Sequence, residues 1–214
     1  MRLRSCLALT LLCAPLAANA DVTFYSNNFE SGVGSGWGSA AATTYLAPFS
    51  TYLGRYSGNQ GVLLTLARPG TPALQPGQSI EYHLTFDFYA IDTWDGDDPA
   101  HGPDYFYVSS NGNVVFAQTF ANQHEYQSFH GPTVGPVSLG YAPGLDSIYR
   151  DIDVTLNPGP AGNIAISLYA LGLQGMSDES WGVDNLRVSY RVVPAPASAG
   201  VLALGGMLAS RRRR

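Results

Sequence analysis

The chain has 214 residues, and eleven arginines against sixteen acidic residues give it a formal net charge of −5, with no lysine. Six of the arginines lie at the two ends, so residues 21–193 carry five arginines, all sixteen acids and a formal charge of about −11. Nucleic acids and anionic lipid surfaces bind positively charged protein surfaces, so this balance argues against both as partners.

The first twenty residues have the three parts of a secretory signal peptide. Two arginines form a basic start, the apolar run LALTLLCAPLA follows, and Ala18-Asn19-Ala20 provides a small-residue cleavage site. We therefore expect export, with cleavage between Ala20 and Asp21. Both cysteines of the chain lie within this segment, so the mature protein is expected to have no disulfide, although its compartment would permit one.

Residues 21–193 show the pattern of one all-β domain. Apolar and polar residues alternate with a period of two, turns rich in glycine and proline separate the apolar runs, and no segment sustains a helical period. Residues 40–60 have weak strand character at best and are predicted as a long connection. The segments predicted as strands are 22–30, 61–67, 79–91, 105–108, 114–116, 134–139, 147–156, 163–171 and 181–192.

This series of short strands predicts a β-sandwich, most plausibly a jelly roll. The stretch from Leu84 to Phe120 organises it, because a long strand, an acidic loop and a hairpin follow one another there. The pair Asn111-Gly112 between two apolar runs is the strongest short-range signal for a hairpin.

Residues 92–104, which follow the longest predicted strand, contain five aspartates and no arginine or lysine. Like charges at that spacing repel, so the loop needs either solvent or a cation. It is therefore a candidate calcium site, although it lacks the glycine and the glutamate that an EF-hand requires. The alternative is a solvated acidic loop. The candidate ligands are Asp92, Asp95, Asp97, Asp98 and Asp104.

Two short segments at the ends of the body resemble jelly-roll carbohydrate-binding modules. Residues 28–32 (NFESG), followed by Trp37, are similar to the opening of such modules, and residues 181–188 (WGVDNLRV) are similar to their closing strand. The resemblance implies that the first and last strands are neighbours and that Glu30 and Asp184 hold a structural Ca²⁺, a cation that prefers several oxygen ligands. In the alternative interpretation, Glu30 is exposed and Asp184 caps a turn.

The sequence indicates no catalytic site. Its four histidines show no H-E-x-x-H spacing, and no G-x-S-x-G motif occurs. A glycosidase needs two carboxylates about 5–10 Å apart across a cleft, and any acidic loop can supply such a pair by chance. We expect a cleft with two close, buried carboxylates in an enzyme and a flat aromatic face in a binding module.

The C-terminal residues 194–214 form three parts in a fixed order. Pro194-Ala195-Pro196 comes first, an apolar, glycine-containing run follows, and four arginines end the chain: Arg211, Arg212, Arg213 and Arg214. The apolar run is shorter than the roughly twenty residues that span a bilayer as a helix. The tail resembles the PEP-CTERM sorting signal of Gram-negative bacteria, with Ala195 in place of the usual glutamate. That resemblance implies recognition by an exosortase and transient anchoring in the inner membrane by a short hydrophobic helix, with the arginines on the cytoplasmic side.

Together these patterns predict an exported, non-catalytic protein of the cell surface or exopolysaccharide matrix. We expect polysaccharide contact through exposed aromatic residues, for which Trp37 and Trp94 are the candidates, and a structural calcium ion. An indole ring packs well against a pyranose ring, but Trp94 in the alternative packs onto the sandwich. A small glycoside hydrolase or polysaccharide lyase and a purely structural matrix protein remain the alternative functions.

Overall fold

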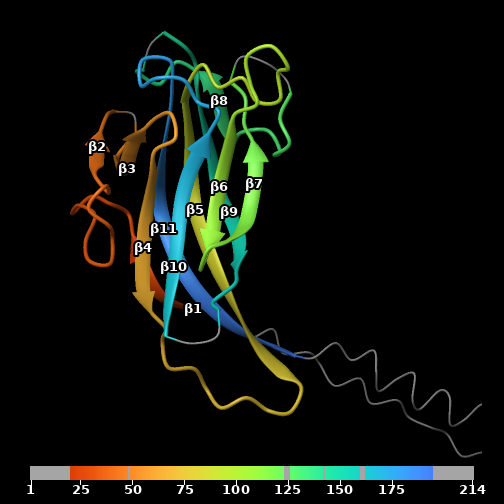
Figure 1. Cartoon of the computed structure of the whole chain (residues 1–214). Helices are drawn as coiled ribbons and strands as arrows, with labels where there is room; N and C mark the ends of the chain where they lie inside the picture. The colour runs from red at the N-terminus through yellow and green to blue at the C-terminus, as the bar shows by residue number, and fades with distance from the viewer. Residues whose placement is uncertain (1–19, 48, 123–125, 142, 160–161, 195–214) are drawn as a thin grey trace, which may run out of the picture.

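The computed structural model describes residues 20–47, 49–122, 126–141, 143–159 and 162–194. The predicted signal peptide up to Asn19, Pro196 of the predicted sorting signal and the four terminal arginines lie outside these residues. The described chain forms two antiparallel sheets that pack face to face, which confirms the predicted β-sandwich (Figure 1). None of its elements is a helix that could cross a membrane.

The larger sheet has seven strands and the smaller has four. In spatial order the larger sheet contains β2 (Thr43–Tyr45), β3 (Thr51–Tyr56), β11 (Glu179–Pro194), β5 (Gln78–Asp92), β9 (Asp146–Leu156) and β8 (Val134–Val137), and β1 (Val22–Asn27) also pairs with β11. The smaller sheet contains β4 (Gly61–Ala67), β10 (Asn163–Leu171), β6 (Tyr105–Ser110) and β7 (Asn113–Thr119).

Most predicted strands are confirmed. In β4 and β10, buried side chains alternate with exposed or partly exposed ones along the strand. β4 and β10 have the predicted bounds, and Asn111 and Gly112 both adopt positive φ in the turn between β6 and β7, as the hairpin signal requires. The predicted long connection over residues 40–60 is wrong, since it contains β2 and β3. β3 is covered on both faces, with Leu53 in the main core and Tyr52 outside it, so it has no alternation to detect.

The main core lies between the sheets and is centred on aromatic rings. Phe88 of β5 is fully buried, with ring centroids 4.4 Å from Phe106 and 4.5 Å from Phe120. A second aromatic cluster covers part of the outer face of the larger sheet, where the segment before β3 folds over β5. Its buried members are Phe49, Tyr52, Tyr89, Ile91 and Ile148.

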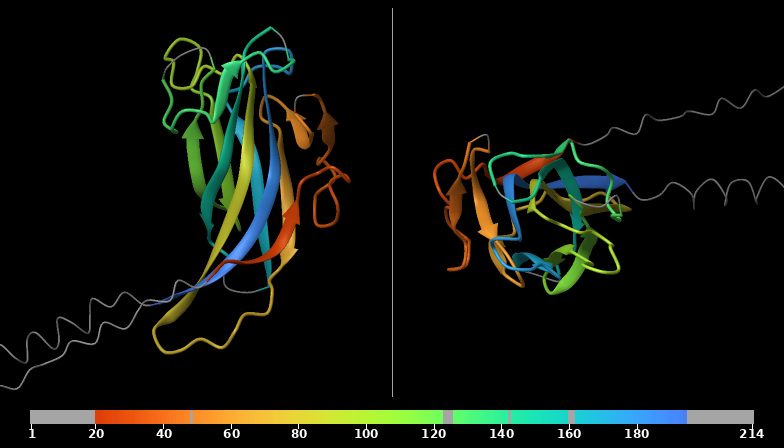
Figure 2. Two further views of the ribbon diagram at one scale, coloured as in Figure 1. Left: turned by 180° about the vertical axis from the view of Figure 1, so that it is seen from behind. Right: turned by 90° about the horizontal axis from the view of Figure 1, so that it is seen from above.

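β5 and β11 form the longest ladder and run through the middle of the larger sheet. Their pairing extends from Glu179 opposite Asp92 to Pro194 opposite Gln78. On the side away from β5, β11 pairs with β3 near its start and with β1 further along. The first and last strands are therefore neighbours, as the resemblance implied. Figure 2 (left) shows this sheet from outside.

We predict that replacement of Phe88 by alanine lowers the free energy of unfolding by about 3–5 kcal/mol, because it leaves a cavity among packed rings. Val114→Ala is the control: Val114 is largely exposed on β7, so its loss costs at most about 0.5 kcal/mol. Equilibrium denaturation in urea measures both variants. Similar losses for both would contradict the position of Phe88 at the core centre.

Candidate functional site

The acidic loop, residues 93–104, crosses from the end of β5 in the larger sheet to the start of β6 in the smaller one. Backbone hydrogen bonds fold it back on itself: Asp98 N donates to Asp95 O, and Asp104 N donates to Gly96 O. Gly96 has φ +61°, and a Cβ atom there would lie 1.9 Å from Tyr126 O, so only glycine fits this turn. The fold therefore brings Asp95 and Asp104, the two ends of the loop, together.

Glu179 joins these two aspartates from β11. One carboxylate oxygen of each of Asp95, Asp104 and Glu179 lies within 4.8 Å of the others. Asp104 and Glu179 are 0% exposed, whereas Asp95 is partly exposed. We call these three residues the carboxylate cluster; it joins the loop, the start of β6 and the start of β11.

Hydrogen bonds satisfy only part of the carboxylate cluster. Asp95 N donates to Asp104 Oδ2 at 2.6 Å, and Gln174 N donates to Glu179 Oε2 at 2.7 Å. The other oxygen of Asp104, Oδ1, is buried and has no hydrogen-bond partner among the described residues while both carboxyls are ionised, whereas a protonated Glu179 would donate to Asp104. A buried, unsatisfied carboxylate oxygen is costly, so this site needs either that proton or a cation.

Burial and mutual repulsion both disfavour ionisation of the carboxylate cluster. Burial raises the pKa of Glu179 to about 8, and the charges of Asp104 and Asp95 act in the same direction. Burial also raises the pKa of Asp104, reinforced by the charge of Asp95. The two buried carboxyls therefore require either a shared proton or a cation.

The five arginines of the body make their contacts away from the carboxylate cluster. Arg55 pairs with Asp92, Arg150 with Asp87, Arg187 with Asp151 and Arg191 with Glu81, and Arg68 donates to the carbonyl oxygens of Pro158 and Gly159. A set of three carboxylates is the donor chemistry that Ca²⁺ prefers, and glycine-rich turns beside it can add carbonyl oxygens.

The remaining aspartates of the loop have other partners. Asp97 accepts a hydrogen bond from Thr119 Oγ1, and Asp98 accepts one from Ala100 N. Of the five aspartates predicted as ligands, the structure brings Asp95 and Asp104 together with Glu179, which the sequence analysis did not name, and calcium there stays a prediction. Glu179 precedes the predicted closing strand, and only the register of β11 against β5 brings it to this loop.

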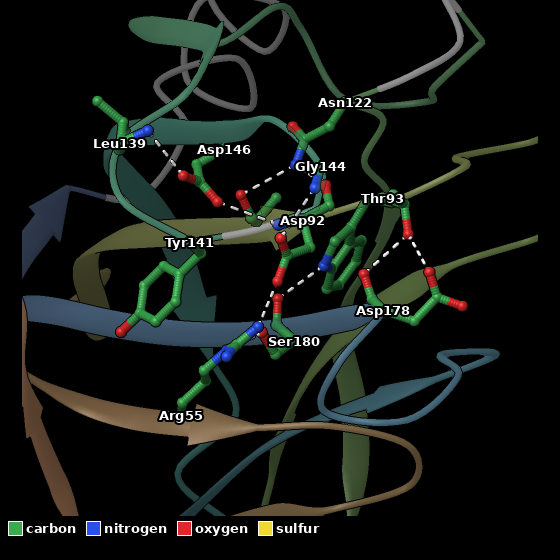
Figure 3. A network of polar contacts seen from close by, with 12 residues as sticks. Arg55, Asp92, Thr93, Asn122, Leu139, Tyr141, Gly144, Asp146, Asp178 and Ser180 are labelled. Carbon is green, nitrogen blue, oxygen red and sulfur yellow. Dashed lines mark hydrogen bonds and ion pairs between the residues drawn. The ribbon is translucent and has the colours of Figure 1, made fainter.

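Asp92 belongs to a separate buried network (Figure 3). Its carboxylate accepts hydrogen bonds from Arg55 and from Gly144 N, and its backbone N–H donates to Asp146 Oδ1. The Asn122 amide group donates to the carbonyl oxygens of Ala90, Asp92 and Leu145. Arg55 pairs with Asp92, and backbone N–H groups donate to both Asp92 and Asp146, so protein groups serve these buried carboxyls and the network fastens the loops at this end of the sandwich.

Glu30 and Asp184 both contact the segment Ser50-Thr51, as expected from the pairing of β1 with β11. Asp184 is buried and accepts hydrogen bonds from Ser50 Oγ and from Tyr89 OH, each at 3.0 Å. Glu30 is exposed, and its Oε1 accepts a hydrogen bond from Thr51 N at 3.0 Å. Protein donors thus serve both carboxylates. Calcium between them stays a prediction, and the carboxylate cluster fits a cation better.

The two candidate tryptophans have different environments. Trp94 is 0% exposed, its Nε1 donates to Ser180 O at 2.7 Å, and its ring packs against Phe88. The prediction that Trp94 stacks on sugar is therefore wrong, since the ring fills the core. Trp37 is half-buried, and its Nε1 donates to Tyr25 OH at 2.7 Å.

An aromatic stack that the sequence analysis missed lies on the outer face of the smaller sheet, which faces the viewer in Figure 1. Tyr107 of β6 and Tyr169 of β10 are paired in register, and their rings stack with centroids 5.0 Å apart and planes 7° apart. Tyr105 packs beside Tyr107 at 5.5 Å. All three side chains are partly exposed.

A hollow of about 340 Å³ adjoins Tyr169. Tyr107 covers one face of the Tyr169 ring, and the neighbour of Tyr169 on the other side is Gly61 of β4, which has no side chain. Residues 38–40 form the far wall, and Leu63 and Ser167 also line the space. None of the residues that line this hollow is charged. We call it the tyrosine hollow.

No family model and no curated protein matches the sequence. Among solved structures, the crystal structure of dimeric latent PorU from Porphyromonas gingivalis is similar to the chain, with a TM-score of 0.41 and 15% sequence identity. The similarity covers 82% of this chain and 13% of that chain, so the chain spans a small part of that protein's length.

We predict that several-millimolar calcium raises the melting temperature by about 3–8 °C and that Glu179→Gln abolishes this rise. The reason is that an ion held by the folded state stabilises it, and the substitution removes a ligand while keeping the side-chain shape. Differential scanning calorimetry in calcium and in EDTA measures the effect.

Asp97→Asn is the matched control, because Asp97 lies in the same loop but bonds to Thr119. It should keep the calcium response. A response that survives Glu179→Gln but disappears in Asp184→Asn would place the ion at Glu30 and Asp184 and would contradict the assignment to the carboxylate cluster.

Proposed function

We propose that this protein is an exported, non-catalytic carbohydrate-binding module with a jelly-roll arrangement of its sandwich. Its polysaccharide site is the tyrosine hollow, and a calcium ion in the carboxylate cluster stiffens one end of the fold. The observation that supports the binding function most strongly is the partly exposed Tyr169 beside an uncharged hollow.

The chemistry of the tyrosine hollow suits a neutral sugar ring. The C–H faces of a pyranose pack against an aromatic ring, and Tyr169 lines a space of about 340 Å³, near the lower end of small-ligand pockets, roughly 300–1,000 Å³. Ser39 and Ser167 line the same space and offer hydroxyl groups to a sugar. Stacked tyrosines also combine an apolar surface with a polar tip.

A glycoside hydrolase or lyase is the second candidate, because Asp104 and Glu179 are close, buried carboxyls with raised pKa values. Access argues against it. Both side chains are fully buried, and neither lines the tyrosine hollow or the larger hollow between β1 and β9. A substrate bound in either place would not reach them, so we assign these carboxyls to the cation.

The proposed destination rests on the two terminal segments. The N-terminal segment directs export with cleavage after Ala20, and the tail from Pro194 is read by an exosortase during transient inner-membrane anchoring. The mature protein then resides on the Gram-negative cell surface or in the extracellular matrix, where a polysaccharide ligand and calcium are both available.

We predict that Tyr169→Ala weakens polysaccharide binding at least about fivefold, because it removes about 1 kcal/mol or more of ring stacking. A glycan array with the purified protein identifies the ligand, and isothermal titration calorimetry then compares the variants. Tyr45→Ala is the control, since Tyr45 is also an exposed tyrosine but lies on β2 of the other sheet.

Three outcomes would contradict this proposal. Equal losses in both variants would exclude the tyrosine hollow as the site. Release of reducing ends from a bound glycan, abolished by Glu179→Gln, would identify a glycoside hydrolase. Binding to no glycan at all would leave a purely structural matrix protein.

We predict that protein recovered from the cell surface or medium begins at Asp21 and lacks Arg211 to Arg214, because both terminal signals are removed on the way. Intact-mass spectrometry checks both ends. In a strain without exosortase, the protein should stay in the inner-membrane fraction. Recovery of extracellular protein with all four terminal arginines would contradict exosortase processing.

A further inference from the structure

Two β-bulges lie side by side on the larger sheet, on opposite sides of β5. In β11 the register shifts between Asp184 and Arg187, and in β9 two residues, Arg150 and Asp151, lie opposite Asp87. Each bulge contains a residue other than glycine with positive φ: Asn185 at 50° and Asp151 at 54°. Residues other than glycine rarely adopt a positive φ, and such residues are found more often at functional sites.

Asp87 of β5 connects the two bulges. Its carboxylate is buried and accepts three hydrogen bonds: from Arg150 Nη1 at 3.2 Å, from Asn185 Nδ2 at 3.0 Å and from Asp151 N at 2.9 Å. Asp87 therefore links the two bulges and fixes their positions relative to each other. Because its oxygens are engaged by the protein, it acts as a positioning residue.

The bulges and the end of β1 surround a hollow of about 590 Å³. This bulge hollow is lined by residues 26–28, Asp87, Arg150, Asp151 and residues 185–187. Except for Asn28, which follows β1, its lining residues belong to β1, β5, β9 and β11 of the larger sheet, whose ribbon Figure 2 (left) shows from outside, whereas the tyrosine hollow lies on the smaller sheet. The apolar Leu186 is 0% exposed, so the surface offered to a ligand is polar.

The bulge hollow contains two exposed arginines of a strongly acidic protein, and two aspartates of the same lining, Asp87 and Asp151, pair with them. Arg150 and Arg187 are two of the five arginines in residues 21–193, and their side chains are 48% and 54% exposed. Each uses one terminal nitrogen in its ion pair with an aspartate, and the flat guanidinium group offers further N–H donors. Such groups bind carboxylates in preference to neutral partners.

We propose that the bulge hollow binds a carboxylate-bearing sugar, the uronic acid unit of an acidic polysaccharide. Arg187 and Arg150 bind its carboxylate, and Asp151, Asn28 and Ser26 bind its hydroxyl groups. The polar lining suits a polyhydroxylated ligand and offers no pocket for an apolar side chain, which argues against a peptide. This site goes beyond the proposed function, and each hollow can bind or fail without the other.

The test is a titration of the isotope-labelled protein, followed by NMR, with trigalacturonate as the probe. Maltotriose is the neutral sugar control and sodium sulfate is the bare-anion control. Trigalacturonate should shift the amide signals of Asn185 and Asp151 with a Kd at least about tenfold lower than the Kd of either control, since charge-assisted hydrogen bonds add to those of the hydroxyls.

Arg187→Gln should weaken trigalacturonate binding at least about tenfold. This variant keeps the fold, because its ion pair with Asp151 is exposed and such pairs contribute little to stability. Arg191→Gln is the matched control: Arg191 is on the same strand but pairs with Glu81 and does not line the hollow. It should bind as the unmodified protein does.

Absence of trigalacturonate shifts at Asn185 and Asp151, equal affinity for sulfate, or equal losses in the Arg187 and Arg191 variants would overturn the uronate site. Binding of neutral glycans through Tyr169 would be unaffected by any of these results. Conversely, if Tyr169→Ala does not weaken polysaccharide binding, the trigalacturonate titration still tests the uronate site.

Discussion

The antiparallel ladder between β5 and β11 is the constraint on which the rest of the structure depends. β9 pairs with β5, and β1 and β3 pair with β11, so the larger sheet is assembled around this ladder. At one end the ladder sets Glu179 opposite Asp92, where the acidic loop leaves β5. In its middle, the bulge in β11 and the bulge in β9 meet at Asp87.

Buried acids are stabilised in two different ways along this ladder. Asp92 and Asp87 each pair with an arginine, and each also accepts a backbone hydrogen bond, so protein groups serve both carboxylates. Asp104 and Glu179 lie at the point where the chain crosses between the sheets, and the five arginines make their contacts elsewhere. A cation there would join the loop to both sheets, which is a staple for a domain whose body contains no cysteine.

The sequence predicts those features that depend on neighbours along the chain. Alternation located β4, β5 and β10, and Asn111-Gly112 located the hairpin, because a strand or turn is encoded in consecutive residues. Features that depend on register were missed: Glu179 beside Asp104, and Tyr107 stacked on Tyr169, come from different strands. For Trp94 the sequence offered both sugar contact and packing onto the sandwich, because acids surround an apolar ring, and the structure agrees with packing.

The central claim is that a cation closes the end of the sandwich at the carboxylate cluster. A crystal structure of the protein with terbium, a calcium substitute with a strong anomalous signal, tests it most directly. With a cation in the carboxylate cluster, we expect an anomalous peak about 2.3–2.6 Å from one oxygen of each of Asp95, Asp104 and Glu179. The contradicting result is a map with no peak at this position and with the Glu179 carboxyl hydrogen-bonded to Asp104 through a shared proton.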